Sequence, residues 1–463
     1  MSDQIPTLNQ LHAVGAAQQP TYPDHAAVDE VVAELRRRPP LVFAGECDDL
    51  RARLADAAAG RAFLLQAGDC AETFGNVTAA AIRDTLRVQL SMAIVLQYAA
   101  QVPVVKVGRI AGQYAKPRSK DTETRGEETL PSYRGDAVNR LEFTADARVP
   151  DPRRLVDVYN MSAATLNLVR AFVQGGFADL RTIHSWNSAF VRNSNVEGRY
   201  EALAGEIERA LAFMIACGVD DEELRTIAYY ASHEALLMEY EHALTRIDSR
   251  TGTPYGTSGH MLWIGERTRQ LDGAHVELLR HLRNPIGVKV GPTADPAEVV
   301  ALAEALDPQR EPGRLTLISR MGADQVRDRL PAIIEAVEAS ERKVVWVCDP
   351  MHGNTFSTSN GYKTRSFDRV VAEVTGFFDV HEQLGTWPGG VHIELTGSDV
   401  TECVGGVQEL AEADLVNRYE TACDPRLNRN QSLELAFYVA ERLNDDLIKR
   451  GSNPVQEFEP REL

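Results

Sequence analysis

Eight short apolar runs recur along this chain, and each ends in polar or charged residues. Runs of this kind are typical of strands that are buried on both faces, as in a parallel sheet. Most are followed by a segment with helical spacing of its apolar residues, as in 77–96, 296–306, 323–340 and 366–384. The eight runs are Ala62–Leu65, Val102–Val107, Ile227–Ala231, Met261–Ile264, Ile286–Val288, Leu315–Ile318, Val344–Val347 and Val391–Ile393.

Eight strand–helix units predict an α/β fold, a closed (β/α)8 TIM barrel whose active site lies at the C-terminal ends of the strands. A doubly wound open sheet would show a similar alternation. In that fold, however, the chemistry would gather at one switch point rather than after nearly every strand. The polar strand ends therefore favour the barrel.

The segments outside the strand–helix units predict decorations of this barrel. Residues 1–60 form an N-terminal extension that packs on the barrel, with helices expected at Ala27–Arg37 and Asp48–Ala59. The catalytic barrel spans 61–445, with a helical insertion at about 150–220 that contains helices at Arg153–Gly175 and Gly198–Cys217. Residues 446–463 are expected to be a mobile tail.

Composition excludes several classes of partner. The formal charge of −18 argues against nucleic acid and anionic membranes, which both need a basic surface. No apolar run approaches the ~18 residues that a membrane span needs, and the N-terminus lacks a signal-peptide pattern, so we expect a cytoplasmic protein. The six cysteines are scattered, so they do not form a disulfide framework.

A cluster of positive charge follows the second run. Between Gln101 and Lys120 the chain carries five cations and no acid: Lys106, Arg109, Lys116, Arg118 and Lys120. Self-repulsion among them is unfavourable unless an anion binds there, and Arg and Lys are the usual ligands of phosphate and carboxylate groups. The alternative is a solvated basic surface.

Four side chains form a candidate metal site because each lies just after a strand or in a late loop: Cys70, His352, Glu394 and Asp424. One sulfur, one imidazole and two carboxylates are compatible with Mn, Fe, Co or Zn and leave positions open for substrate. Taken singly, His352 could be an ordinary hydrogen-bonding residue and Cys70 a small core residue.

A second group is cationic and lies at the ends of four different runs: Arg109, Arg267, Lys289 and Arg320. These ends would face one another in a barrel, where unpaired cations repel. Ion pairs to Glu266, Asp349 or Asp69 are one explanation. A small, highly anionic substrate beside a metal is the other, and we favour it.

Six motifs are specific enough to indicate a family: residues 109–119 (RIAGQYAKPRS), 263–270 (WIGERTRQ), 287–292 (GVKVGP), 312–322 (PGRLTLISRMG), 348–355 (CDPMHGNT) and 419–428 (YETACDPRLN). Together they resemble class II 3-deoxy-D-arabino-heptulosonate 7-phosphate synthase, from about residue 15 to 445. The resemblance implies a decorated (β/α)8 barrel that condenses phosphoenolpyruvate with erythrose 4-phosphate and releases phosphate, in the first step of the shikimate pathway.

The resemblance also assigns roles by motif. It implies that a divalent metal, Mn²⁺ first and Co²⁺ as an alternative, is held by Cys70, His352, Glu394 and Asp424. It implies that phosphoenolpyruvate contacts Arg109, Glu266, Arg267, Lys289 and Arg320, of which Lys289, Glu266 and Arg109 are expected to be catalytic. It implies that the sugar phosphate binds the loop of Lys116, Pro117, Arg118 and Ser119.

Other consequences of the resemblance are partners and regulation. It implies a homodimer or homotetramer, with chorismate mutase as a protein partner. The inserted helices are where family members bind inhibitory aromatic amino acids, although no motif here indicates which one. The alternatives are the same reaction in aromatic secondary metabolism, a metal-dependent barrel hydrolase, and a non-catalytic sensor of aromatic amino acids. Because Cys423 precedes Asp424, we also expect oxidation to link Cys70 and Cys423 in metal-free protein.

Overall fold

Eight parallel strands close into a barrel in the computed structural model, which describes residues 5–175 and 227–450 together with 205, 209, 210, 212, 213 and 216. Around the barrel the order is β1-β14-β11-β10-β9-β8-β5-β2, so neighbours in the chain are neighbours in the sheet. The strands are β1 (Phe63–Gly68), β2 (Val104–Arg109), β5 (Tyr230–Glu234), β8 (Met261–Ile264), β9 (Ile286–Val290), β10 (Leu315–Ser319), β11 (Val345–Cys348) and β14 (Gly390–Glu394). The predicted barrel is confirmed, and each of the eight runs overlaps one of these strands.

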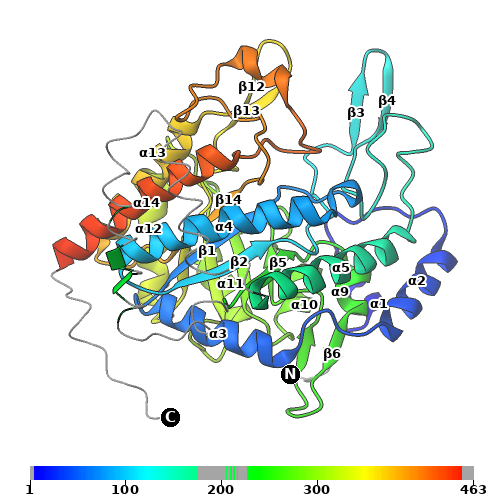
Figure 1. Cartoon of the computed structure of the whole chain (residues 1–463). Coiled ribbons are helices and arrows are strands. Elements are labelled where there is room, and N and C mark those ends of the chain that lie inside the picture. Colours follow the sequence, from blue (N-terminus) through cyan, green and yellow to red (C-terminus); the bar gives the residue numbers. More distant parts are fainter. Residues whose placement is uncertain are drawn as a thin grey trace.

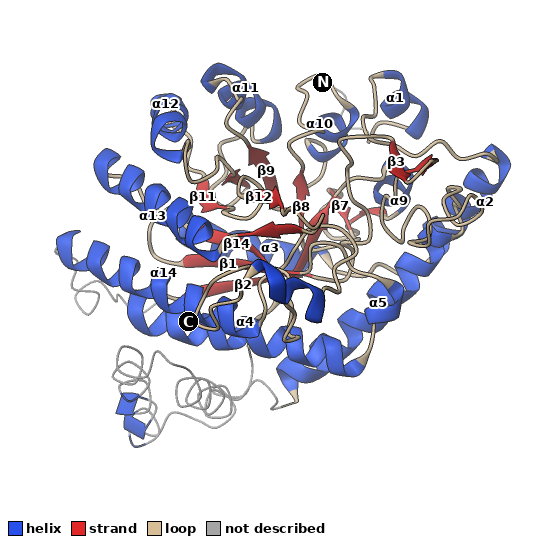
Figure 2. Cartoon of the chain, turned by 90° about the horizontal axis from the view of Figure 1, so that it is seen from above, coloured by secondary structure: helices blue, strands red, loops and turns tan. Residues whose placement is uncertain are grey.

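Helices surround the strands, as Figure 2 shows from above. The outer ones are α4 (Ala79–Ala100), α5 (Arg154–Gln174), α9 (Met238–Ala243), α10 (Ala274–Leu279), α11 (Pro296–Leu306), α12 (Val326–Ala339), α13 (Phe367–Leu384) and α14 (Arg429–Arg450). Short 3-10 helices cover Phe74–Asn76 and Glu412–Asn417. Local sequence sets their boundaries: α11 begins at Pro296 because Asp295 caps it by accepting from the Ala297 amide at 2.8 Å.

The N-terminal segment forms α1 (Leu8–Ala13), α2 (His25–Arg37) and α3 (Ala44–Ala58). Helix α3 lies below the strands in Figure 1 and presents Leu50, Leu54 and Ala57 to the barrel interior. There they pack with inward-facing residues of six strands: Leu64, Val105, Val107, Tyr230, Met261, Trp263, Ile318, Val345 and Val347. The N-terminal end of the barrel is therefore filled with apolar side chains.

The same inward face becomes polar toward the C-terminal ends of the strands. Side chains in a strand alternate between the two faces, so residues two and four positions apart point the same way. On the inward face, Leu64, Val107 and Tyr230 are therefore followed, toward the C-terminal ends of their strands, by Gln66, Arg109 and Glu234. In the same way Lys289 and Glu394 end the inward faces of β9 and β14. One end of the barrel is thus apolar and the other carries charged groups.

Three antiparallel hairpins decorate the barrel, and the sequence did not predict them. They are β3–β4 (Thr122–Arg125 with Glu128–Pro131), β6–β7 (Thr245–Ile247 with Pro254–Gly256) and β12–β13 (Thr355–Ser357 with Lys363–Arg365). In Figure 1, β3–β4 and β12–β13 both lie at the top, opposite α3. The hairpin β12–β13 contributes side chains to the C-terminal end of the barrel.

Some of the predicted segments lie partly or wholly outside the described residues. Within the range 150–220 the structure describes α5, which lies in sequence between β2 and β5, whereas most of the expected helix Gly198–Cys217 falls outside. The tail beyond residue 450 falls outside as well. Among the helices that are described, none combines the length and the apolar content needed to cross a membrane.

Candidate active site

A cavity of about 180 Å³ opens at the C-terminal end of the barrel. Seven cationic side chains and three carboxylates line it, so it is locally positive in a protein of net charge −18. All nine residues expected to contact substrate line this cavity: Arg109, Lys116, Pro117, Arg118, Ser119, Glu266, Arg267, Lys289 and Arg320. Two of the four expected metal ligands, His352 and Asp424, line it too.

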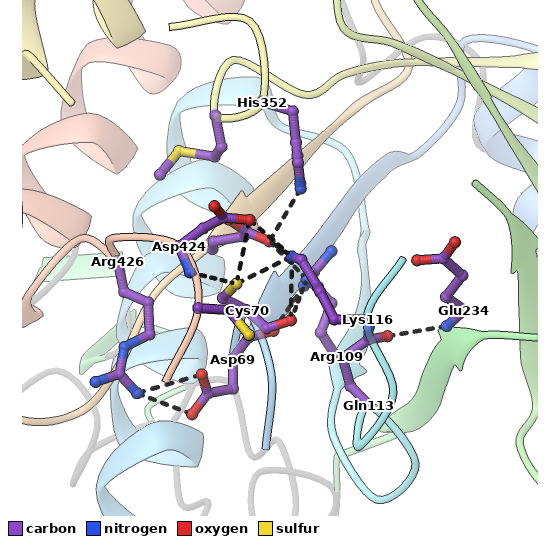
Figure 3. Close-up of polar contacts among 12 residues, drawn as sticks. Asp69, Cys70, Arg109, Gln113, Lys116, Glu234, His352, Asp424 and Arg426 are labelled. Atoms are coloured by element: carbon purple, nitrogen blue, oxygen red, sulfur yellow. Dashed lines mark hydrogen bonds and ion pairs between the residues drawn. The ribbon is translucent and has the colours of Figure 1, made fainter. Parts of the chain in front are cut away.

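The expected metal ligands converge beside this cavity. The Sγ atom of Cys70 and carboxylate oxygens of Glu394 and Asp424 lie within 4.8 Å of one another. The fourth residue joins them, because Nε2 of His352 is 3.2 Å from Oε1 of Glu394. In Figure 3, His352 points toward this group from above. Cys70 and Glu394 are fully buried, whereas Asp424 and His352 are 14% and 20% exposed.

The backbone explains why residues far apart in sequence meet here. Gly68, the last residue of β1, pairs with both Arg109 and Glu394 in the neighbouring strands. Gly68 has φ +147°, and a Cβ atom there would lie 2.5 Å from the carbonyl oxygen of Arg109, so glycine is required. Cys70 follows two residues later. The loop that carries Asp424 is held by Leu427, whose amide donates to the Glu394 carbonyl at 3.0 Å.

Lys116 lies among three of these ligands (Figure 3). Its Nζ is 3.0 Å from Sγ of Cys70, 3.1 Å from Glu394 Oε1 and 3.2 Å from Asp424 Oδ2. Burial alone would lower the pKa of Lys116, but the anionic groups around it raise that pKa well above its usual value. The Lys116 ammonium therefore compensates the negative charge of the ligand group.

The donor set fits a divalent ion. The Cys70 sulfur is a soft donor, the His352 imidazole is a borderline one and the two carboxylates are hard, a mixed set that Mn²⁺, Fe²⁺, Co²⁺ and Zn²⁺ accept. Burial would raise the pKa of Glu394, but the charges of His352, Lys116 and Arg365 hold it well below the usual range. Burial and the nearby Glu394 charge raise the pKa of Cys70. Glu394 is thus held as a carboxylate, and a cation there would favour the Cys70 thiolate.

Two of the predicted substrate cations are themselves held in ion pairs. Arg109 donates to Glu394 Oε1 at 2.9 Å, and Lys289 Nζ donates to Asp349 Oδ2. Arg320 donates to the carbonyl oxygen of His352 at 3.2 Å, while its Nε is buried and unpartnered among the described residues. Pairing of Lys289 with Asp349 agrees with the ion-pair explanation, but these cations still line the cavity.

A polar network inside the barrel fixes the Arg109 guanidinium. Arg109 Nη1 donates to Nε2 of His392, and Nδ1 of His392 faces Gln66 Oε1 at 2.8 Å. Burial, followed by the charges of Lys289 and Arg109, lowers the pKa of His392 well below its usual value. A neutral imidazole can accept from Arg109 and donate to Gln66 at the same time. Trp263 packs against Arg109, with its ring centroid 5.1 Å from the guanidinium carbon.

Glu72 shapes the loop that follows β2. Its carboxylate accepts from the amides of Ala111, Gly112 and Gln113 at 2.8–2.9 Å. Ala111 has φ +61°, a left-handed conformation that is unfavourable for alanine. A Cβ atom on Gly112 would lie 2.4 Å from Nδ1 of His233, so glycine is needed there. Through these contacts Glu72 holds the first part of the loop that carries Lys116 and Arg118.

The structure adds residues to the site that the sequence did not single out. Glu234 lines the cavity with a buried, unpartnered Oε1 among the described residues, and burial raises its pKa. Lys363 of β13 lines it and pairs with Asp424, and Arg365 donates to Glu394 Oε2 at 2.8 Å. Asp349 lies beneath it. Their positions at the end of β5 and directly after β11 could have indicated Glu234 and Asp349 as site residues. No sequence pattern marked Lys363 in the hairpin.

Comparison with known proteins agrees with these features. A family model described as the class-II DAHP synthetase family matches residues 6–440. A phospho-2-dehydro-3-deoxyheptonate aldolase of Streptomyces coelicolor is 62% identical over 430 residues, which cover 93% of this chain and 96% of that protein. Phospho-2-dehydro-3-deoxyheptonate aldolase AroG of Mycolicibacterium smegmatis is 55% identical over 452 residues, covering 96% of each chain.

Among the solved structures that match is a truncated 3-deoxy-D-arabino-heptulosonate 7-phosphate synthase from Thermotoga maritima. It is 14% identical and covers 84% of this chain and 87% of its own, with a TM-score of 0.32. At this TM-score the likeness does not bear on the fold, which follows from the strand pairing. The family match and the two close relatives together identify the family.

Proposed function

The chain belongs to the class-II DAHP synthetase family, and we infer from this that it is a 3-deoxy-D-arabino-heptulosonate 7-phosphate synthase, a transferase of the shikimate pathway. The enzyme condenses phosphoenolpyruvate with erythrose 4-phosphate and water and releases phosphate, in the first step toward chorismate and the aromatic amino acids. The observation that supports this most directly is the cationic cavity beside a buried group of sulfur, nitrogen and carboxylate donors.

We propose that Cys70, His352, Glu394 and Asp424 hold a divalent ion, Mn²⁺ first and Co²⁺ as an alternative. When bound, such an ion supplies Lewis-acid polarisation of a substrate carbonyl oxygen. Support comes from the short distances among the four donors and from the mixed donor chemistry.

Phosphoenolpyruvate is proposed to bind over the inward-facing cations at the strand ends. It carries a carboxylate and a phosphate, and Arg109, Lys289 and Arg320 offer donors for both. Glu266 and Arg267 would complete this subsite. Two anionic groups that repel in water are thereby held together at a fixed distance from the second substrate.

The sugar phosphate is proposed to bind the loop formed by Lys116, Pro117, Arg118 and Ser119. Arg118 and Ser119 lie nearer the solvent than Lys116, which is 8% exposed. A phosphate at the outer part of this loop would leave the aldehyde end of erythrose 4-phosphate directed toward Lys116. Arg118 is oriented by Glu123, whose carboxylate accepts from it at 3.2 Å.

The bond changes then follow from where the two reactants are held. C3 of phosphoenolpyruvate forms a bond to the aldehyde carbon, and positive character develops at C2. Water adds to C2, and the bond between C2 and the phosphate oxygen breaks to leave a ketone at C2. The two protons of the water go to the former aldehyde oxygen, which becomes a hydroxyl group, and to the departing phosphate. Lys289 and the arginines stabilise the departing phosphate. Glu266 would hold the water beside Lys289, because its Oε2 is buried and unpartnered among the described residues while Oε1 accepts from Arg269 at 3.0 Å.

A two-substrate assay tests this function. Full-length protein with Mn²⁺ should consume phosphoenolpyruvate and release phosphate only when erythrose 4-phosphate is present. Arg118→Ala should raise KM for erythrose 4-phosphate by about 10- to 100-fold, because a charge-assisted hydrogen bond contributes about 1.5–3 kcal/mol. Phosphate release without the sugar, or an unchanged Arg118→Ala enzyme, would favour a metal-dependent hydrolase instead.

Assembly, regulation and location remain predictions. We expect a homodimer or homotetramer, chorismate mutase as a protein partner and a cytoplasmic location. Light scattering of the purified chain, alone and mixed with a chorismate mutase, tests the first two. Adding each aromatic amino acid to the two-substrate assay shows whether the enzyme is inhibited, as expected for amino-acid biosynthesis, or unregulated, as expected for secondary metabolism.

A further inference from the structure

Asp349 is a fully buried carboxylate directly after β11 that touches two functional side chains at once. Its Oδ2 accepts from Nζ of Lys289 and from Nδ1 of His352, the latter at 2.7 Å. Its Oδ1 accepts from the amides of Met351 and His352 at 3.0 and 3.3 Å, and its own amide donates to the Ser319 carbonyl at 2.7 Å. It does not line the cavity, so it acts on ligands only through its neighbours.

The two neighbours belong to different halves of the proposed site. His352 belongs to the metal ligands and Lys289 to the phosphoenolpyruvate cations, and this inference therefore rests on the proposed function. A carboxylate that accepts from Nδ1–H fixes the imidazole tautomer and leaves Nε2 free to bind a metal. Nε2 of His352 does face Glu394, at 3.2 Å from its Oε1.

We propose that Asp349 is a positioning residue that couples metal binding at His352 to phosphoenolpyruvate binding at Lys289. One oxygen, Oδ2, serves both side chains, so each competes with the other for its negative charge. An anionic substrate that takes up hydrogen bonds of the Lys289 ammonium leaves more of that charge to His352. The imidazole then becomes a stronger metal ligand, and the two ligands strengthen each other's binding.

A second ion pair also joins the two halves, so the test must separate the two routes. Arg109 contacts Glu394 at 2.9 Å, and this contact does not involve Asp349. Any coupling that the Arg109–Glu394 pair carries would therefore persist when Asp349 is changed. A substitution at Asp349 therefore isolates the route proposed here.

The first experiment compares Asp349→Asn with the wild-type chain by titration calorimetry. Mn²⁺ is added to the metal-free protein without substrate, and phosphoenolpyruvate is added separately in the presence of a chelator. We expect Asp349→Asn to weaken Mn²⁺ binding by about 10- to 100-fold, the usual effect of removing a partner of a metal-binding histidine. Phosphoenolpyruvate binding to the metal-free protein should weaken too, because Lys289 loses its fixed position.

Glu373→Gln is the matched control. Glu373 is also buried beneath the loops after β10 and β11, and it accepts from the Gly322 amide at 2.8 Å and from Asn354 Nδ2 at 2.7 Å. It makes no hydrogen bond to Lys289 or His352. We expect Glu373→Gln to lower the melting temperature while leaving the Mn²⁺ affinity unchanged. If it reproduces the binding losses of Asp349→Asn, the role of Asp349 is only structural and the proposal is wrong.

The second experiment is a double-mutant cycle on Mn²⁺ affinity. Lys289→Met removes the ammonium that competes for Oδ2, so it should change the Mn²⁺ affinity of the chain that has Asp349. In an Asp349→Asn background, Lys289→Met should change the Mn²⁺ affinity by a factor that differs by about threefold or more from its factor in the wild-type background. Lys289→Gln, which also removes the positive charge, replaces Lys289→Met if that variant does not fold. Equal effects in both backgrounds would overturn the coupling.

Failure of the inference and failure of the proposed function give different results. A wild-type chain that binds neither Mn²⁺ nor phosphoenolpyruvate overturns both. A wild-type chain that binds both, with affinities that Asp349→Asn leaves unchanged, overturns the coupling and leaves the synthase function standing.

Discussion

Both carboxylate oxygens and the backbone amide of Asp424 contact neighbouring side chains. Oδ2 is 3.2 Å from Nζ of Lys116, Oδ1 pairs with Lys363, and the amide donates to Sγ of Cys70 at 3.3 Å. The cations around it outweigh the effect of burial and hold its pKa below the usual range. Asp424 is therefore an ionised group that orients three neighbours as well as a proposed metal ligand.

Asp424→Ala should abolish turnover while the fold is retained. Loss of a direct metal ligand should reduce kcat by at least about 100-fold, since removing even an outer partner of a metal ligand costs 10- to 100-fold. Phosphate release with saturating Mn²⁺ measures this, and circular dichroism checks the fold. Near-normal turnover of Asp424→Ala would remove this residue from the ligand group.

The lowered pKa of Lys289 predicts that phosphoenolpyruvate binding weakens at alkaline pH. Burial lowers its pKa to about 8, against the opposing effect of Asp349. The side chain is thus positively charged below that pH and loses its proton above it. KM for phosphoenolpyruvate should therefore rise above about pH 8. Lys289→Arg stays charged, so its KM should be higher throughout but flat across this range. A wild-type KM that is constant from pH 7 to 9.5 would contradict the assignment.

Residues with a role in a linear motif were predictable, and residues with a role only in space were not. Cys70, His352 and Asp424 stand in recognisable strings of sequence. Lys363 is the exposed first residue of a three-residue hairpin strand with no apolar pattern, and its contact with Asp424 depends on how that hairpin folds over the barrel. Glu234 lies three residues beyond the predicted run Ile227–Ala231, and only closure of the barrel brings its carboxylate to the cavity.

At the scale of elements, the loop after β2 depends on a residue from the loop after β1. Glu72 binds three successive amides of that loop, including the left-handed Ala111. Without this carboxylate the three N–H groups would be buried without partners, which is costly. The position of Lys116 and Arg118 is thus set partly by a side chain some forty residues earlier in the sequence.

Glu72→Ala should destabilise the protein and disorder the substrate loop. We expect a loss of about 3–5 kcal/mol in the free energy of unfolding, because each buried N–H group left without a partner costs about 1–3 kcal/mol. Urea denaturation measures it. KM for erythrose 4-phosphate should rise as well, whereas Glu72→Gln, which can still accept from part of the loop, should lie between alanine and wild type. Unchanged urea midpoints would show that the three amides do not depend on Glu72.

The loops that carry Cys70 and Cys423 are in contact with each other. The amide of Asp424, next to Cys423, contacts Cys70 Sγ, and Arg118 contacts Cys423 Sγ at 3.8 Å. An oxidant should therefore form a Cys70–Cys423 disulfide in metal-free protein and prevent reactivation by Mn²⁺. Non-reducing mass spectrometry detects the bond. Cys423→Ser should be protected, and full reactivation of the oxidised wild type would contradict the prediction.

Strands and hairpins differed in how far the sequence revealed them. The barrel strands are buried on both faces, so their apolar runs stand out, and β8 begins and ends as predicted. Where strands extend further than predicted, as β5 does through Ser232, His233 and Glu234, polar side chains face the site and break the apolar pattern. The strands of β12–β13 are three residues long and half exposed, so neither length nor alternation marks them.

The whole molecule combines a strongly negative surface with a positive cavity. A net charge of −18 repels phosphorylated substrates at long range, while seven cations attract them at the site. Salt screens the long-range repulsion more than the buried contacts, because the Debye length is about 8 Å at physiological ionic strength. The cavity, and not the overall field, therefore selects the substrate.

Metal binding should stabilise the molecule as a whole, because the four proposed ligands come from the loops after β1 and β11, the end of β14 and the loop before α14. A ligand that binds only the folded state adds RT ln(1 + [L]/Kd), about 4 kcal/mol at a thousandfold excess over Kd. Mn²⁺ should therefore raise the melting temperature by several degrees and a chelator should reverse it. The effect should be absent in Asp424→Ala. Equal shifts in both proteins would place the ion elsewhere.

Helix α3 fills the N-terminal end of the barrel. Among the described residues, the active-site cavity therefore opens only at the C-terminal end. Substrates and products must therefore enter and leave through the same opening, at the C-terminal end of the barrel. In the proposed arrangement, phosphoenolpyruvate at the strand ends lies deeper than the sugar phosphate, which covers it from the loop at the rim. Inorganic phosphate left behind after the reaction would have to wait for the larger product to depart, so it should act as a competitor of incoming phosphoenolpyruvate.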